Sequence, residues 1–143
     1  MKTCIFFFAL ILFLNIKIFA QPVFDATRIV DTVQFVLGKE LPAIEWGTVN
    51  EGSSLKYIFR TVNTEIEPTY IVKITTGDGN CEPRFSEKAF NPNDIMEFTI
   101  LLKTDDLYGD EKRHIRVTFL NKKKNRFYAD FYIQGFVKPI ENE

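Results

Sequence analysis

The sequence predicts an all-β domain, a sandwich of about seven strands. Three observations predict it. Apolar and polar residues alternate with a period of two, turn residues separate the alternating stretches, and about the last hundred residues contain no convincing helical pattern. Short strands at this spacing are typical of a sandwich.

The strands follow in order from this pattern. In residues 54–63, Leu55, Tyr57 and Phe59 alternate with polar or smaller neighbours, which indicates a strand with one buried face. The Asn-Pro-Asn-Asp turn then precedes another apolar stretch with turn residues on both sides. Strands are expected over residues 43–49, 54–63, 69–76 and 95–103.

Residues 113–137 give the clearest pattern, a hairpin. Ile115, Val117 and Phe119 face one way before the loop over residues 121–125 turns the chain. The returning strand repeats the alternation at Phe127, Ala129, Phe131 and Ile133. The hairpin is therefore expected to bury one face.

Residues 24–37 allow two interpretations. Asp25 could cap a helix that carries Ile29, Val33, Val36 and Leu37 on one face. Against this, the β-branched residues of the segment lower helix propensity and favour a strand. We expect a strand, which pairs with an edge of the sandwich.

The N-terminus has the pattern of a secretory signal peptide. Lys2 supplies a positive charge, residues 5–14 are apolar without interruption, and Ala20 is a small residue before Gln21. An apolar run of about ten residues is shorter than the roughly 20 that a membrane-spanning helix needs. We expect cleavage after residue 20, no membrane span in the mature chain, and a periplasmic or secreted location.

The expected mature chain is one domain. An N-terminal extension with one added strand is expected over residues 21–43, the sandwich over 44–137 and a short tail over 138–143. The chain has 18 Lys and Arg against 19 Asp and Glu, and two of the lysines leave with the signal peptide. This mild acidity argues against binding to nucleic acid.

The order of the predicted elements resembles that of a known family. The sequence is similar to a secreted Ig-like domain of unknown function common in Bacteroidota, a family related to the ASPM/SPD-2/Hydin and PapD-like sandwiches. The resemblance implies an Ig-like antiparallel β-sandwich and export, and it carries over no activity. The residues that match are Trp46, Gly47, Val49, Gly52, Pro92, Asn93, Gly135, Phe136 and Val137.

The chain departs from this family at Cys81. The family usually carries Cys-Gly-Cys-Thr in the loop where this chain has Gly-Asn-Cys-Glu, so one thiol of the pair is missing. His114 is the sole histidine and is predicted on another strand, which argues against a thiol nucleophile or a zinc site. A free or packed thiol is favoured, with an intermolecular disulfide and a redox or thiol role as alternatives.

Two further features are candidates for interaction. Lys122, Lys123, Lys124 and Arg126, with Lys112, Arg113 and Arg116 on the preceding strand, form a basic hairpin. A solvated turn is the favoured interpretation of this hairpin, and core packing is the favoured interpretation of Trp46. The alternative is an adhesin-like module that binds glycan or lipid through Trp46 and the hairpin.

The function predicted from the sequence is non-catalytic. We expect an exported Ig-like module with a protein-protein interaction or structural role in the cell envelope, and no catalytic, cofactor-binding or metal-binding residues. Its partner is an unknown protein, bound through a sheet edge whose backbone groups lack a neighbour.

Overall fold

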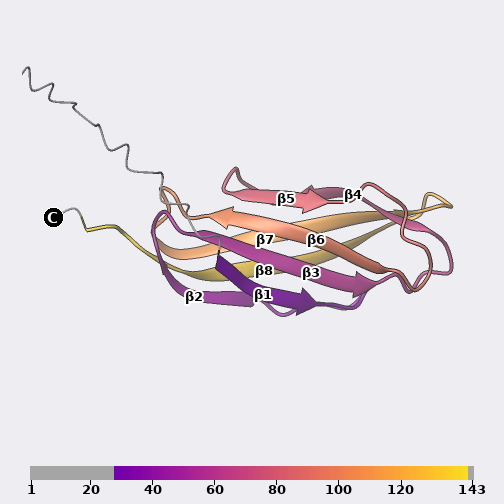
Figure 1. Cartoon of the computed structure of the whole chain (residues 1–143), viewed down its shortest axis with the longest axis horizontal. Helices are drawn as coiled ribbons and strands as arrows, with labels where there is room; N and C mark the ends of the chain where they lie inside the picture. The colour runs from indigo at the N-terminus through magenta and orange to yellow at the C-terminus, as the bar shows by residue number, and fades with distance from the viewer. Residues whose placement is uncertain (1–27, 142–143) are drawn as a thin grey trace, which may run out of the picture.

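The computed structural model describes residues 28–141, so the expected signal peptide over residues 1–20 lies outside the described residues. Within them the chain forms eight strands in two four-stranded sheets (Figure 1). The all-β sandwich expected from the sequence is therefore confirmed. The strands are β1 (Arg28–Gln34), β2 (Ile44–Asn50), β3 (Ser54–Val62), β4 (Thr69–Thr75), β5 (Cys81–Phe85), β6 (Ile95–Lys103), β7 (Gly109–Asn121) and β8 (Arg126–Lys138).

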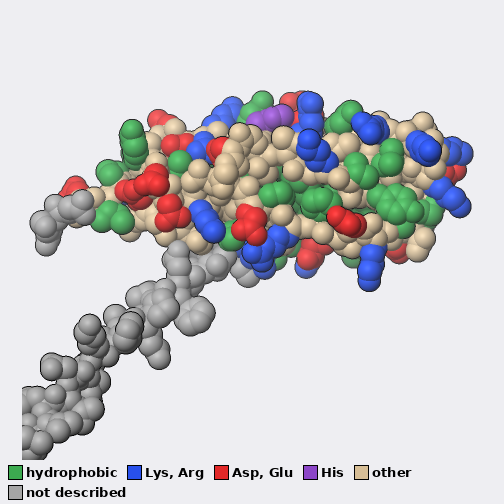
Figure 2. Space-filling view, turned by 90° about the horizontal axis from the view of Figure 1, so that it is seen from above, with side chains coloured by type: hydrophobic (Ala, Val, Ile, Leu, Met, Phe, Trp, Pro, Cys, Tyr) green, Lys and Arg blue, Asp and Glu red, His purple; other side chains and the backbone are tan. Residues whose placement is uncertain are grey.

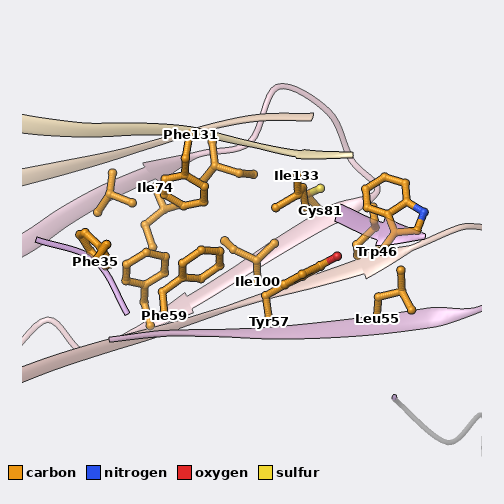
Figure 3. Packing of buried hydrophobic residues seen from close by; sticks show 14 of the residues in the cluster. Phe35, Trp46, Leu55, Tyr57, Phe59, Ile74, Cys81, Ile100, Phe131 and Ile133 are labelled. Carbon is orange, nitrogen blue, oxygen red and sulfur yellow. The ribbon is translucent and has the colours of Figure 1, made fainter. Parts of the chain in front are cut away.

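The two sheets hold the strands in the orders β1-β3-β6-β5 and β2-β8-β7-β4. Their inner faces form the core, because the period of two sends every second side chain inward. Phe59 of β3 stacks on Phe98 of β6 with ring centroids 4.8 Å apart. It also lies 4.6 Å, centroid to centroid, from Phe131 of the other sheet, and Figure 3 shows these two rings. Aromatic contacts of this kind tie one sheet to the other.

The hairpin expected over residues 113–137 is formed by β7 and β8. Ile115, Val117 and Phe119 are buried, and they stand opposite Phe131, Ala129 and Phe127, as the alternation predicts. The strands continue further than expected, because β7 already begins at Gly109. The turn of this hairpin lies at the end of the molecule opposite the C-terminus (Figure 1).

Segment 24–37 forms strand β1 over residues 28–34 of its described part. β1 pairs with β3, and Phe35, just beyond its end, is buried against Phe98 in an edge-to-face contact at 6.0 Å. Residues 24–27 lie outside the described residues. The extension expected before residue 44 therefore contributes a strand and a core side chain to the sandwich itself.

The expectation of purely antiparallel pairing is corrected at two edges. β1 pairs with β3 in parallel, and β2 pairs with β8 in parallel. The chain crosses from one sheet to the other between β1 and β2, so no hairpin turn forces either strand to run opposite to its neighbour. All other strand pairs are antiparallel.

The stretch around Cys81, expected as a loop, is strand β5. The backbone N–H of Lys103 donates to the C=O of Asn80 at 2.8 Å, and hydrogen-bonded pairs alternate along an antiparallel ladder. Pro83 therefore has its backbone nitrogen turned away from β6, toward the sheet edge. A proline is tolerated at this position because no ladder hydrogen bond is lost.

Candidate functional site

Cys81, the first candidate from the sequence, is a buried free thiol with 4% of its surface exposed. Burial raises the pKa of this thiol to about 12, the charge of Asp78 adds to the rise, and Arg113 opposes it. A thiol with a high pKa and no access to solvent is a poor nucleophile. Cys81 is thus placed as a core side chain.

The charged groups near Cys81 come from two places, Asp78 just before it in the chain and Arg113 on β7 of the other sheet. Arg113 lies on the inner face of β7, where it contacts Asp78 and pairs with Glu111 at 2.6 Å. Arg84 instead points outward and pairs with Glu82 at 2.8 Å. Arg113 therefore does not belong to the basic surface expected from the sequence, because alternation sends it to the opposite face from Lys112 and Arg116.

Trp46, the second candidate, lies in the core with 5% of its surface exposed (Figure 3). Its indole occupies the space that a side chain at position 135 would need, since a Cβ on Gly135 would lie 2.3 Å from its Nε1. A ring in this position has no free face for a sugar. Core packing therefore explains the position of Trp46.

The basic hairpin turn, the third candidate, is exposed. Lys122, Lys124 and Arg126 are exposed, and Lys123 pairs with Glu67 at 2.8 Å. Figure 2 shows lysine and arginine side chains gathered at this end of the molecule. Exposed ion pairs contribute little to stability, so the pair between Lys123 and Glu67 does little to stabilise the fold. The turn is therefore an exposed cationic surface.

A candidate site that the sequence-based reasoning missed is the outer face of the β7–β8 hairpin, here called the hairpin face. The inner face of the same strands builds the core, so these side chains alternate outward. Tyr128 and Tyr132 are 50% and 41% exposed. The hairpin face consists of Lys112, His114, Arg116, Tyr128, Asp130 and Tyr132.

A triad of Arg116, Asp130 and His114 occupies the middle of the hairpin face. Arg116 donates to Asp130 twice, from Nε at 2.8 Å and from Nη2 at 3.3 Å, and His114 Nε2 lies 2.8 Å from the same carboxylate. The hydrogen bond from Arg116 lowers the pKa of the Asp130 carboxyl, and the bond from His114 acts in the same direction. The carboxylate is therefore ionised and held in place. Figure 2 shows His114, in purple, beside acidic and basic side chains.

The tyrosines of the hairpin face are held by cations. Lys112 Nζ lies 4.3 Å from the ring centroid of Tyr132, and the Arg116 guanidinium lies 5.4 Å from that of Tyr128. The His114 ring is 5.0 Å from the Tyr132 ring. Cation-π contacts of this kind orient exposed rings without burying them.

A hollow of about 520 Å³ lies beside the hairpin face. The loop over residues 38–41 forms one wall, and side chains of the triad and the two tyrosines form the other. This volume falls in the range of ligand clefts, roughly 300 to 1,000 Å³. The hairpin face is thus a partly concave surface rather than a plain sheet.

Two general features bear on the chemistry of the chain. Among residues 28–141, no group of three or more His, Cys, Asp or Glu is arranged to hold a metal ion. The described part of the chain also has no helix that is long and apolar enough to cross a membrane.

Comparison with known proteins supports the fold. No family model and no curated protein matches the sequence. Among solved structures, the ASH/PapD-like domain of human CEP192 is similar, with a TM-score of 0.54 and 10% identity over 80% of this chain and 84% of that one. Vibrio cholerae VesB protease matches with a TM-score of 0.48 and 9% identity over 74% of this chain and 30% of its own. The first likeness shows the fold alone, an Ig-like β-sandwich.

Proposed function

We propose that the protein is an exported, non-catalytic module of the cell envelope that binds another protein through the hairpin face. The observation that carries the proposal is the presence of Tyr128, Tyr132 and Arg116 together on an exposed sheet face. Tyrosine and arginine are enriched at protein interfaces and at the residues that dominate binding energy.

The geometry favours binding over catalysis. The tyrosines are oriented by cations and the arginine by a carboxylate, so little side-chain entropy remains to be lost when a partner docks. Cys81, the residue on which a redox role would depend, is buried with a raised pKa. The sandwich shared with the CEP192 domain is consistent with an interaction module.

Export is part of the proposal and is supported by the sequence. Residues 1–20 have the charge, apolar run and small final residue of a signal peptide. Fractionation of the native cells, with detection of the protein by an antibody, tests the location. A cytoplasmic pool of the uncleaved chain would contradict this part of the proposal.

The binding part is tested by capture and crosslinking in the native envelope. We expect a tagged full chain to capture a protein partner, and Arg116→Ala to weaken that capture. Arg60→Ala is the matched control: Arg60 and Arg116 have similarly exposed side chains, 47% and 51%, and each pairs with a carboxylate at 2.7 or 2.8 Å. Arg60 lies on the other sheet. Equal capture by both variants would contradict the assignment to the hairpin face.

A further inference from the structure

One side of β8 has no neighbouring strand along its first half. β7 pairs with β8 from Arg126 to Val137, whereas β2 pairs with β8 only from Ile133 onward. Among the described residues, no strand pairs with residues 126–132 on the β2 side. This part of β8 is therefore an open sheet edge.

The backbone groups of this edge point away from the sheet. The N–H of Asn121 donates to the C=O of Asn125 at 3.1 Å, which fixes which pairs of the β7–β8 ladder are hydrogen-bonded. Because these pairs alternate, Ala129 bonds to β7, while the N–H and C=O of Tyr128 and Asp130 face the open side. They are a ready template for an added strand.

Two other sheet edges, those of β5 and β4, are protected in part. On β5, Pro83 removes an outward N–H, and the C=O of Cys81 accepts from the Thr76 hydroxyl at 3.2 Å. At the start of β4, Thr69 and Phe90 exchange two backbone hydrogen bonds at 2.9 Å. Proline and covering segments are the devices that prevent strand addition. The first half of β8 has neither.

The hollow beside the hairpin face lies along this open edge. Ala129 and Asp130 line it from β8, and Lys39, Glu40 and Leu41 line it from the loop that leads into β2. A strand placed here would lie end to end with β2, with room for its side chains in the hollow.

The charges around the edge favour an acidic segment. Arg116 already pairs with Asp130, which leaves Glu40 as the other carboxylate that lines the hollow. Within residues 28–141, Lys39, Lys112 and Arg126 make no ion pair. An incoming strand therefore meets an excess of positive charge.

We propose that the first half of β8 accepts an extended, acidic segment of another protein by strand addition. The backbone of the segment bonds to Tyr128 and Asp130, and its acidic side chains face Arg126 at the start of β8 and Lys39 in the loop before β2. This rests on the proposed function, because it names the chemistry of the partner that the hairpin face binds.

The test is an NMR titration of the full chain with short peptides as probes. One hexapeptide alternates glutamate with valine, a second alternates lysine with valine, and a third is the acidic peptide with methylated backbone nitrogens. We expect the acidic peptide to shift the amide signals of Tyr128 and Asp130 and to slow their hydrogen exchange. The lysine peptide and the methylated peptide are expected to bind at least about tenfold more weakly.

Two variants separate the backbone from the side chain. Tyr128→Pro removes the outward N–H without breaking a β7 hydrogen bond, as Pro83 does on β5, whereas Tyr128→Ala removes only the ring. We expect the proline variant to bind the acidic peptide about tenfold more weakly than the alanine variant. If the proline variant fails to fold, the methylated peptide makes the same distinction on the unchanged protein.

Several outcomes overturn the proposal. They are no binding of the acidic peptide at millimolar concentration, equal binding of the lysine peptide, unchanged exchange at Tyr128 and Asp130 on binding, or occupation of the edge by a second copy of this chain. A native partner that is lost in Arg116→Ala but kept at full strength in Tyr128→Pro overturns strand addition and leaves the proposed function standing. A partner indifferent to both variants overturns the two together.

Discussion

At the scale of single residues, Gly135 shows how the core is fitted together. It lies on the inner face of β8 between Ile133 and Val137, and the Trp46 indole occupies the place of its missing side chain. We expect Gly135→Ala to lower the free energy of unfolding by about 1 to 3 kcal/mol, because the added methyl group overpacks the site. Urea denaturation followed by tryptophan fluorescence measures it.

The control for this substitution is Gly79→Ala. Gly79 has nothing within 4 Å of the place where its Cβ would lie. Its substitution should leave the unfolding midpoint nearly unchanged. Equal midpoints for the two variants would show that the contact between Trp46 and position 135 has no influence on stability.

Cys81 predicts a specific dependence of stability on pH. Its pKa rises from the ordinary value of 9.0 to about 12 in the folded protein, chiefly through burial. The unfolded chain therefore loses this proton first as pH rises, and linkage requires that the free energy of unfolding fall between about pH 9 and pH 12. Its contribution is fully present below pH 9.

The measurement compares the native chain with Cys81→Ala by urea denaturation at a series of alkaline pH values. Other groups titrate in this range in both proteins, so the difference between them isolates the thiol. We expect the stability advantage of the native chain to shrink as pH rises. A constant difference from pH 8 to pH 11 would contradict the buried, neutral thiol.

At the scale of elements, β1 is an integral part of the sandwich. Phe35, which follows it, packs edge-to-face on Phe98, so Phe35→Ala should cost about 3 kcal/mol through lost burial and a residual cavity. Val36→Ala is the matched control, because Val36 is the next residue and is 51% exposed. Chemical denaturation of both variants tests this. Similar small losses would mean that the segment after β1 packs only loosely.

The open edge of β8 predicts an alternation in hydrogen exchange. In the free protein, the amides of Tyr128 and Asp130 should exchange quickly, while those of Ala129 and Phe131, bonded to β7, should be protected. NMR-detected exchange resolves the four positions individually. Uniform protection along residues 128–131 would show that another segment covers the edge.

The elements differ in how far the sequence predicts them. Alternation with a period of two identified β3 and the β7–β8 hairpin, because each has one buried and one solvated face. β5 escaped prediction, since it has five residues, follows a glycine turn and contains Pro83. β1 pairs in parallel with β3, and β2 pairs in parallel with β8. These pairings depend on which sheet each strand joins, and local sequence does not encode that choice.

The candidate site was predictable only in part. The residues that face the core from β7 and β8 were identified, and the same alternation places Tyr128, Asp130 and Tyr132 together on the opposite face. This second face was the signal that could have revealed the site. The contacts of Arg116 and His114 with Asp130 depend on the cross-strand register of β7 and β8. A shift of one residue in that register would abolish these contacts.

At the scale of the whole molecule, the pairing of β2 with β8 sets the order of assembly. β2 lies near the beginning of the described chain and β8 at its end, yet each is the other's neighbour in one sheet (Figure 1). Contacts between segments so distant in sequence make folding slow, because a long loop must close before they contribute any stability.

A ribosome synthesises β8 after the other seven described strands, so the sheet β2-β8-β7-β4 cannot form before that point. A chain ending at Asn125 should therefore remain unfolded, because it lacks the strand that joins β2 to β7 and supplies Phe131 to the core. Circular dichroism of that fragment checks this, and a β spectrum with cooperative melting would contradict it. Because one sheet is incomplete until β8 is made, the growing chain has no finished sandwich before that point, and a chain without a finished fold is one that can be threaded through a narrow pore.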